Sequence, residues 1–177
     1  MRENRSIDVE IDGIRFISHG HYCDGMNNWL CHKLKENDPQ VIAYCAGHLA
    51  KMLPDNAVII PIPGHHGYAV QTLNLARAIT ERTNGCIPVA NILKGNNRAS
   101  NYQVKKVGQP LSVDQIGFYQ IASLPKDKIP YILDNVVDTG TTAKAAVKAL
   151  GGGIVLSYAM SDTLLGKENR KLSGFRR

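Results

Sequence analysis

The segment Ile129–Thr142, with the sequence IPYILDNVVDTGTT, constrains the fold more than any other part of the chain. Its first half is a short apolar run, which is typical of a strand buried inside a parallel sheet. A tight turn follows, in which Gly140 allows the backbone to come close to a ligand, and a helix then begins. Threonine hydroxyls and unpaired backbone N–H groups at the helix start would form an anion site of the size of a phosphate. The plainer alternative is a turn in which Asp138 or a threonine only caps the helix.

The rest of the chain alternates between predicted strands and predicted helices. Short apolar runs predict strands at Ala57–Ile62, Ile87–Leu93, Tyr131–Val137 and Ile154–Met160. Start and stop signals predict helices at Pro39–Leu53, Ala69–Arg82 and Thr141–Leu150. This order is typical of a doubly wound α/β fold with a mainly parallel sheet, which binds ligands at the carboxyl ends of its strands. The polar stretch Lys94–Gln120 is interpreted as a long functional loop.

The two ends of the chain differ from this pattern. Ile7–Ile11 and Ile14–Ser18 alternate around Asp12-Gly13, which predicts an N-terminal β-hairpin, either an appendage or an edge of the fold. The tail has five Lys or Arg residues against one Glu, and we interpret it as solvated. Nucleic-acid contact is the alternative, but no binding motif supports it. We interpret residues 1–177 as a single domain with a hairpin or appendage (1–37), a core (57–163) and a basic tail (167–177).

The overall composition limits the choice of partners. The formal net charge of +6 suits phosphate-rich partners such as nucleotides and sugar phosphates. No apolar run reaches the roughly 18 residues that a membrane-spanning helix needs, so no membrane partner is expected. The polar N-terminus does not resemble a signal peptide, and we therefore expect a cytoplasmic protein.

Histidines and cysteines are concentrated in one stretch. His19, His21, Cys23, Cys31 and His32 are residue types that zinc prefers, and on a strand the first three would share one face. No CxxC pair is present, however. We interpret the stretch as reduced cysteines with surface or core histidines, and expect no metal held by the protein alone. A zinc site is the alternative.

The segment Ile132–Thr142, ILDNVVDTGTT, resembles the 5-phosphoribosyl-1-pyrophosphate (PRPP) signature of type I phosphoribosyltransferases. The resemblance implies that fold, and it implies that Asp134 and Asn135 face the ribose. It further implies that the 5-phosphate is held by Asp138, Thr139, Gly140, Thr141 and Thr142. Asn135 stands where the signature has a second acid, so one negative charge beside a Mg²⁺–PRPP complex is missing.

A second segment, Ile59–Gly67 or IIPIPGHHG, is similar to the pyrophosphate-binding loop of the same family. The resemblance implies that pyrophosphate is bound by Pro63, Gly64, His65, His66, Gly67 and Lys94. Gly67-Tyr68 with Asn74–Ala76, and the excursion Leu93–Phe118 with its Asn101–Gln103, are closest in pattern to ComF-like phosphoribosyltransferases. The zinc finger of that group is absent. Three further cations of the excursion would close over the leaving group: Arg98, Lys105 and Lys106.

The resemblance implies a transferase of the glycosyltransferase class. It would move phosphoribosyl from PRPP, bound with Mg²⁺, to a nitrogen acceptor such as a purine-like base and release pyrophosphate. Asp138 is the candidate catalytic base, with helix capping as its alternative role. The alternative function is a non-catalytic PRPP- or nucleotide-binding regulatory protein or a competence-like accessory protein, which Asn135 favours. Dimers are common in the fold group, so a homodimer is a further expectation.

Overall fold

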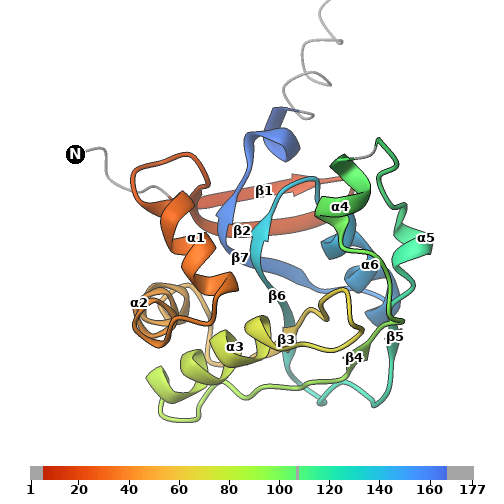
Figure 1. Cartoon of the computed structure of the whole chain (residues 1–177). Helices are drawn as coiled ribbons and strands as arrows, with labels where there is room; N and C mark the ends of the chain where they lie inside the picture. The colour runs from red at the N-terminus through yellow and green to blue at the C-terminus, as the bar shows by residue number, and fades with distance from the viewer. Residues whose placement is uncertain (1–5, 107, 167–177) are drawn as a thin grey trace, which may run out of the picture.

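The structure is a computed structural model that describes residues 6–106 and 108–166 (Figure 1). Its centre is a five-stranded sheet with the strand order β1-β2-β7-β6-β3 in the described part of the chain. The strands are β1 (Ile7–Ile11), β2 (Ile14–His21), β3 (Ala57–Pro61), β6 (Ile129–Val137) and β7 (Ile154–Met160). Only β1 and β2 pair antiparallel, and all other neighbours are parallel. The sheet is therefore mixed and mostly parallel, as the strand–helix alternation predicts.

Helices cover both faces of this sheet. The six helices in the described ranges are α1 (Asn27–Lys35), α2 (Pro39–Ala50), α3 (Gln71–Arg82), α4 (Asn101–Lys106), α5 (Val113–Ile116) and α6 (Thr141–Leu150). Helices α1, α2 and α3 lie on one face, and α5 and α6 lie on the other (Figure 1). The result is a layered α/β architecture compatible with a doubly wound fold. None of the helices among these residues is both long and apolar enough to cross a membrane.

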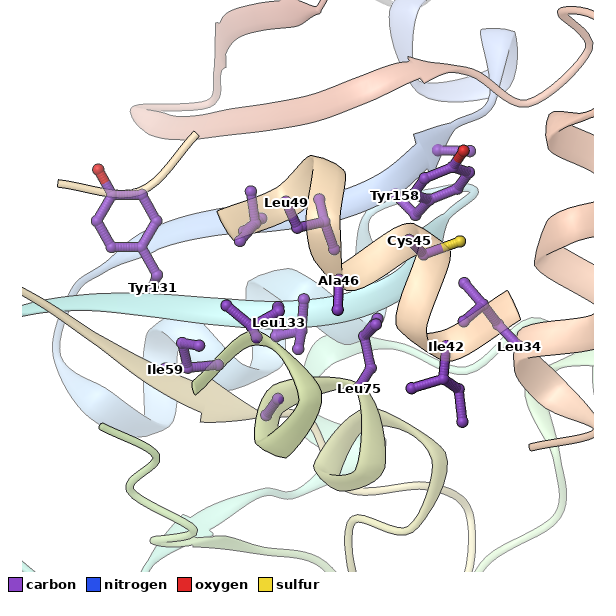
Figure 2. Close-up of a cluster of buried hydrophobic side chains, with 14 of the residues drawn as sticks. Leu34, Ile42, Cys45, Ala46, Leu49, Ile59, Leu75, Tyr131, Leu133 and Tyr158 are labelled. Atoms are coloured by element: carbon purple, nitrogen blue, oxygen red, sulfur yellow. The ribbon is translucent and has the colours of Figure 1, made fainter. Parts of the chain in front are cut away.

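The core on the α1–α3 face contains side chains from the central strands of the sheet. Figure 2 shows Leu49 of α2 and Leu75 of α3 pointing toward Ile59 of β3 and Leu133 of β6, and all four side chains are fully buried. A second cluster fills the opposite face under α6. Every residue of β3 is buried, because strands covered on both sides have no solvent face.

The N-terminal hairpin is an integral edge of the sheet, so the appendage alternative is wrong. β2 pairs in parallel with β7, and Phe16 of β2 is fully buried. The hairpin turn has positive φ at Asp12 and Gly13, as the Asp-Gly pair predicts. Lys144 of α6 donates to Asp12 Oδ2 at 2.5 Å, which ties the turn to the helix layer. Hairpin residues thus share a buried cluster with residues of the predicted core 57–163.

Two elements differ from what the sequence predicts. The first is helix α1, which is not predicted, because Met26 at its N-cap makes no side-chain capping hydrogen bond and the helix has no acidic first turn. The predicted strand Ile87–Leu93 is reduced to a single parallel bridge between Val89 and Ile59. Pro88 has no backbone N–H to donate, so it contributes to the pairing only through its carbonyl, which accepts from Ile59 N at 2.9 Å.

The excursion after residue 93 is more ordered than a plain loop. Leu93–Lys94 forms β4, which pairs with β5 (Tyr119–Gln120) in a second, two-stranded sheet. Between them lie α4 and α5. Ser112 and Gln115 form a capping box at the start of α5, a local signal for this short helix.

Candidate functional site

The carboxyl ends of β3, β6 and β7 and the N-terminal end of α6 border one cavity of about 890 Å³. Three segments singled out in the sequence meet in its wall, namely Pro63–His65, Asp134–Asn135 and Asp138–Thr142. They meet because β3, β6 and β7 are parallel, so the loops that follow them leave the same edge of the sheet.

The turn into α6 leaves the start of the helix open toward the cavity. Gly140 is the N-cap, with φ 78°, and has no side chain of its own to cap the helix, whereas the Thr139 hydroxyl accepts from Thr141 N at 3.5 Å. The Thr139 and Thr141 hydroxyls lie 3.0 Å apart beside the first N–H groups of the helix. An open helix start with two hydroxyls is a suitable site for a phosphate dianion.

Gly140 is required at this turn for two reasons. Its positive φ is unfavourable for any residue with a side chain. A Cβ atom built there would also lie 3.1 Å from Leu164 Cδ1 and 3.7 Å from Phe16 Cζ, both in the buried layer below. The hairpin strand β2 thus supports the turn from underneath.

Two polar residues at the end of β6 are held in a low-dielectric setting. Burial raises the pKa of Asp134 to about 6. The backbone N–H of Asn135, the charge of Lys35 and the backbone N–H of Val136 lower this pKa and offset part of the effect of burial. The neighbouring Asn135 is only 6% exposed, and its Oδ1 has no hydrogen-bond partner among the described residues. An unsatisfied buried carbonyl oxygen is unfavourable, so a ligand donor at this position would stabilise the site.

The loop after β3 is a closed turn that brings His65 to the cavity. Gly64 N donates to Tyr68 O at 3.0 Å, and Gly67 N donates to Gly64 O at 3.1 Å. The His65 and His66 rings lie 3.9 Å apart, and burial, His66 and Arg98 together lower the pKa of His65. Pro63, Gly64 and His65 line the cavity, as expected for the predicted pyrophosphate residues.

The other predicted pyrophosphate residues, His66, Gly67 and Lys94, are not among the residues that line the cavity. Gly67, at φ 90°, accepts at its carbonyl from Gly95 N at 2.8 Å, and a Cβ there would collide with the Gly95 carbonyl. Lys94 Nζ lies 5.7 Å from the centre of the Tyr68 ring. Gly67 and Lys94 therefore join the excursion to the loop after β3.

Arg98 is fixed at the cavity wall by this docking. Its backbone N donates to His65 O at 2.9 Å, and its guanidinium lies 6.0 Å from the centre of the Phe118 ring. Burial lowers the pKa of Arg98. Lys106, at the end of α4, also lines the cavity, whereas the side chain of Lys105 lies outside the described part of the chain.

Several cavity residues were missed by sequence reasoning. Ser161, directly after β7, donates from its hydroxyl to Asp138 Oδ1 at 2.9 Å and accepts from Thr163 N at 3.0 Å. Its position one residue beyond a parallel strand is the signal that would have identified it. Tyr22, which follows β2, lines the opposite wall together with His32 and Lys35. The last two lie on α1, and the sequence did not predict that helix.

The histidine–cysteine stretch is dispersed in three dimensions. His19 stacks on Tyr158, with ring centres 4.9 Å apart, and His21 Nδ1 lies 3.3 Å from Asp162 Oδ1. Cys31 is buried in the core and Cys23 is exposed. The described residues contain no group of three or more His, Cys, Asp or Glu side chains placed to hold a metal ion. The predicted tail at residues 167–177 lies outside the part of the chain that the structure describes.

No family model matches the sequence, and no curated protein matches it either. The cavity itself is therefore the basis for assigning a function. Its charged wall residues, histidines aside, are the cations Lys35, Arg98 and Lys106 and the carboxylates Asp134 and Asp138. A predominantly cationic wall with an open helix start suits a ligand that carries several phosphates and hydroxyls.

Proposed function

We propose that the chain is a phosphoribosyltransferase that binds PRPP together with Mg²⁺ and transfers the phosphoribosyl group to a nitrogen acceptor. The observation that carries this proposal is that three kinds of group line the same cavity. They are the N-terminal end of α6, the oxygens of Asp134 and Asn135, and the loop Pro63–His65 with Arg98. The phosphate, ribose and pyrophosphate of PRPP would each be matched by one of them. The cavity volume of about 890 Å³ is within the range of small-molecule sites.

The 5-phosphate would bind at the turn Asp138–Thr142, which supplies N–H groups and threonine hydroxyls. The ribose hydroxyls would donate to Asp134 and to the unsatisfied Oδ1 of Asn135. His65, Arg98 and Lys106 would then contact the pyrophosphate, and the docked position of Arg98 supports this role.

The residues present fit Mg²⁺ when it arrives with PRPP. Asp134 and Asn135 offer the oxygen ligands that this ion prefers. Substrate oxygens and water would supply the other ligands of the ion. Bound Mg²⁺ would supply positive charge beside the pyrophosphate.

In the reaction, the acceptor nitrogen forms a bond to the anomeric carbon while the bond from that carbon to pyrophosphate breaks. Pyrophosphate leaves with the electron pair of that bond, and the ribose carries oxocarbenium character in the transition state. Asp138 would accept the proton that the nitrogen loses, and Ser161 donates a hydrogen bond to one of its oxygens. The fixed phosphate and ribose contacts would orient the anomeric carbon toward the acceptor.

Calorimetry with PRPP in Mg²⁺, repeated with EDTA, tests the binding step. We expect saturable binding that weakens when Mg²⁺ is removed. A screen of nitrogen bases for pyrophosphate release then tests turnover. Absence of binding by PRPP and by ribose 5-phosphate would overturn the proposal.

A second candidate function is a non-catalytic PRPP- or nucleotide-binding regulatory or competence-like accessory protein on the same scaffold. Asn135 favours it, because an amide in place of a carboxylate leaves less negative charge to hold Mg²⁺. Saturable binding of PRPP without pyrophosphate release on any base would support this function over the transferase. Asn135→Asp is expected to tighten Mg²⁺-dependent binding in either case.

A further inference from the structure

The wall of the cavity opposite α6 is formed by Tyr22, His32 and Lys35. None of these residues has a role in binding PRPP as proposed above. Tyr22 follows the end of β2, and the other two lie on α1 at a spacing of three residues, which places them on one side of the helix. The wall therefore belongs to the same cavity but is free to contact a second ligand.

Backbone hydrogen bonds fix this wall relative to the candidate base. Tyr22 N donates to Met160 O at 2.8 Å, and Ser161 N donates to Val137 O at 2.9 Å. The ends of β2, β7 and β6 are thus held side by side, with Tyr22 and Asp138 on either side of Ser161. Asp138 also contributes to raising the pKa of Tyr22, after burial, Cys31 and Cys23, which agrees with their proximity.

Helix α1 is anchored firmly enough to serve as a binding wall. The Asn27 side-chain amide donates to His21 O at 2.8 Å, which joins the helix start to the end of β2. Leu30, Cys31 and Leu34 are buried against the sheet. This orientation leaves His32 and Lys35 exposed at the cavity mouth.

The polar groups of the wall carry an excess of positive charge. The Tyr22 hydroxyl lies 3.3 Å from His32 Nε2. The Lys35 ammonium forms no hydrogen bond or ion pair with any residue that the structure describes, although its charge lowers the pKa of Asp134. Once ribose engages Asp134, this ammonium would have no anionic neighbour among the described lining residues other than Asp138.

The geometry points to an acceptor that is a planar nitrogen heterocycle bearing a carboxylate, with the carboxylate toward Lys35 and His32 and the reacting nitrogen toward Asp138. This inference rests on the proposed function, since it names the acceptor class of the same cavity. The Tyr22 ring and hydroxyl lie between the two ends and would contact the heterocycle. A carboxylate would gain an attraction to the Lys35 ammonium that a neutral heterocycle lacks, so the wall would favour the anion.

Matched pairs of heterocycles test the inference directly. The full chain is first saturated with Mg²⁺ and ribose 5-phosphate, and the binding of that pair is itself recorded. Orotate is then compared with uracil, and nicotinate with nicotinamide, by calorimetry. We expect the carboxylate of each pair to bind at least about tenfold more tightly, with a preference that falls as salt is added.

Two variants assign the preference to α1. Lys35→Gln is expected to remove most of it while leaving the affinity for ribose 5-phosphate within about twofold. Lys33→Gln is the matched control, because it removes the same charge from the same helix at a residue that pairs with Glu36 and does not line the cavity. His32→Gln gives a second, independent readout should Lys35→Gln fold poorly.

The outcomes of these experiments distinguish the proposed function from the inference about the acceptor. Binding of ribose 5-phosphate without any preference for the carboxylates would overturn the inference and leave the proposed function standing. A preference that survives both Lys35→Gln and His32→Gln would overturn the assignment to this wall. Failure of ribose 5-phosphate and PRPP to bind at all would remove the proposed function and the inference with it.

Discussion

At the scale of single residues, the site depends on polar groups whose surroundings are set by the ends of the strands. Asn135 is buried and Asp134 is half-buried at the end of β6, whereas Asp138 is exposed and accepts a hydrogen bond from Ser161. Two carboxylates a few residues apart therefore have different environments.

Asp134 should link stability and ligand binding to pH. Its pKa is raised to about 6, so the folded chain holds this proton more tightly than the unfolded chain does. The contribution of Asp134 to the free energy of unfolding is thus largest below about pH 4 and is lost as the pH rises toward about 6. Asp134→Asn is expected to stabilise the chain above pH 6 by about 1–3 kcal/mol, the range of such a burial penalty, in urea titrations.

The same variant should lose affinity for PRPP by about 10- to 100-fold, because an amide replaces an ionised acceptor. PRPP should bind the natural chain more tightly as the pH rises through about 6. Asp24→Asn, at an exposed turn residue outside the cavity, is the control and should change neither property. An Asp134→Asn variant that binds PRPP normally would remove this residue from the ribose site.

Ser161 should act as a positioning residue for Asp138. Ser161→Ala removes the 2.9 Å hydrogen bond and is expected to lower kcat/KM for the acceptor about tenfold, while PRPP affinity stays nearly constant. Steady-state kinetics at saturating PRPP would measure the effect, and Ser161→Thr should restore most of the activity because it keeps the hydroxyl. Equal loss in both variants would indicate a purely structural role.

At the scale of elements, the turn from β6 into α6 combines the strongest sequence signal with the most constrained backbone. Its strand, glycine and helix were all predicted correctly, because a continuous apolar run and a conformationally unusual glycine are local properties. Helix α1 was not predicted, since its start carries no capping signal and the burial of Leu30, Cys31 and Leu34 depends on packing against the sheet. The strand predicted at Ile87–Leu93 failed because Pro88 limits pairing there.

A pair of glycines on α6 separates backbone strain from ligand binding. Gly140 and Gly151, at the two ends of the helix, have φ values of 78° and 73°. Gly140→Ala and Gly151→Ala should each destabilise the chain by about 1–2 kcal/mol, as forcing a side chain into the left-handed region does. Gly140→Ala should lose somewhat more, because its Cβ would crowd Leu164.

Only Gly140→Ala should also weaken PRPP binding in calorimetry, because only that turn borders the cavity. Gly151→Ala, with nothing within 4 Å of its added Cβ, controls for the loss of stability. Normal PRPP affinity in a folded Gly140→Ala chain would argue against a phosphate at this helix start.

At the scale of the whole molecule, the N-terminal hairpin packs beneath the turn that begins α6 and so supports the cavity. The sequence left open whether it is an appendage or an edge, because the partner of a strand depends on residues far along the chain. β2 in fact lies between β1 and β7, and Phe16 packs under the turn at Gly140. The loops that form the cavity therefore rest on strands from both ends of the sequence.

Hydrogen exchange can measure this integration. Amides of β2 at Phe16–Ser18, which pair with Val155–Ser157 of β7, should exchange as slowly as those of β6, at the rate set by global unfolding. Residues of a loosely attached hairpin would instead exchange much faster than the central strands. Saturating PRPP with Mg²⁺ should slow exchange in β2 and β6 by the same factor, since a ligand that binds only the folded chain stabilises every cooperatively unfolding element equally. Unequal factors would mean that the hairpin opens while the ligand stays bound, so that β2 does not support the turn that holds it.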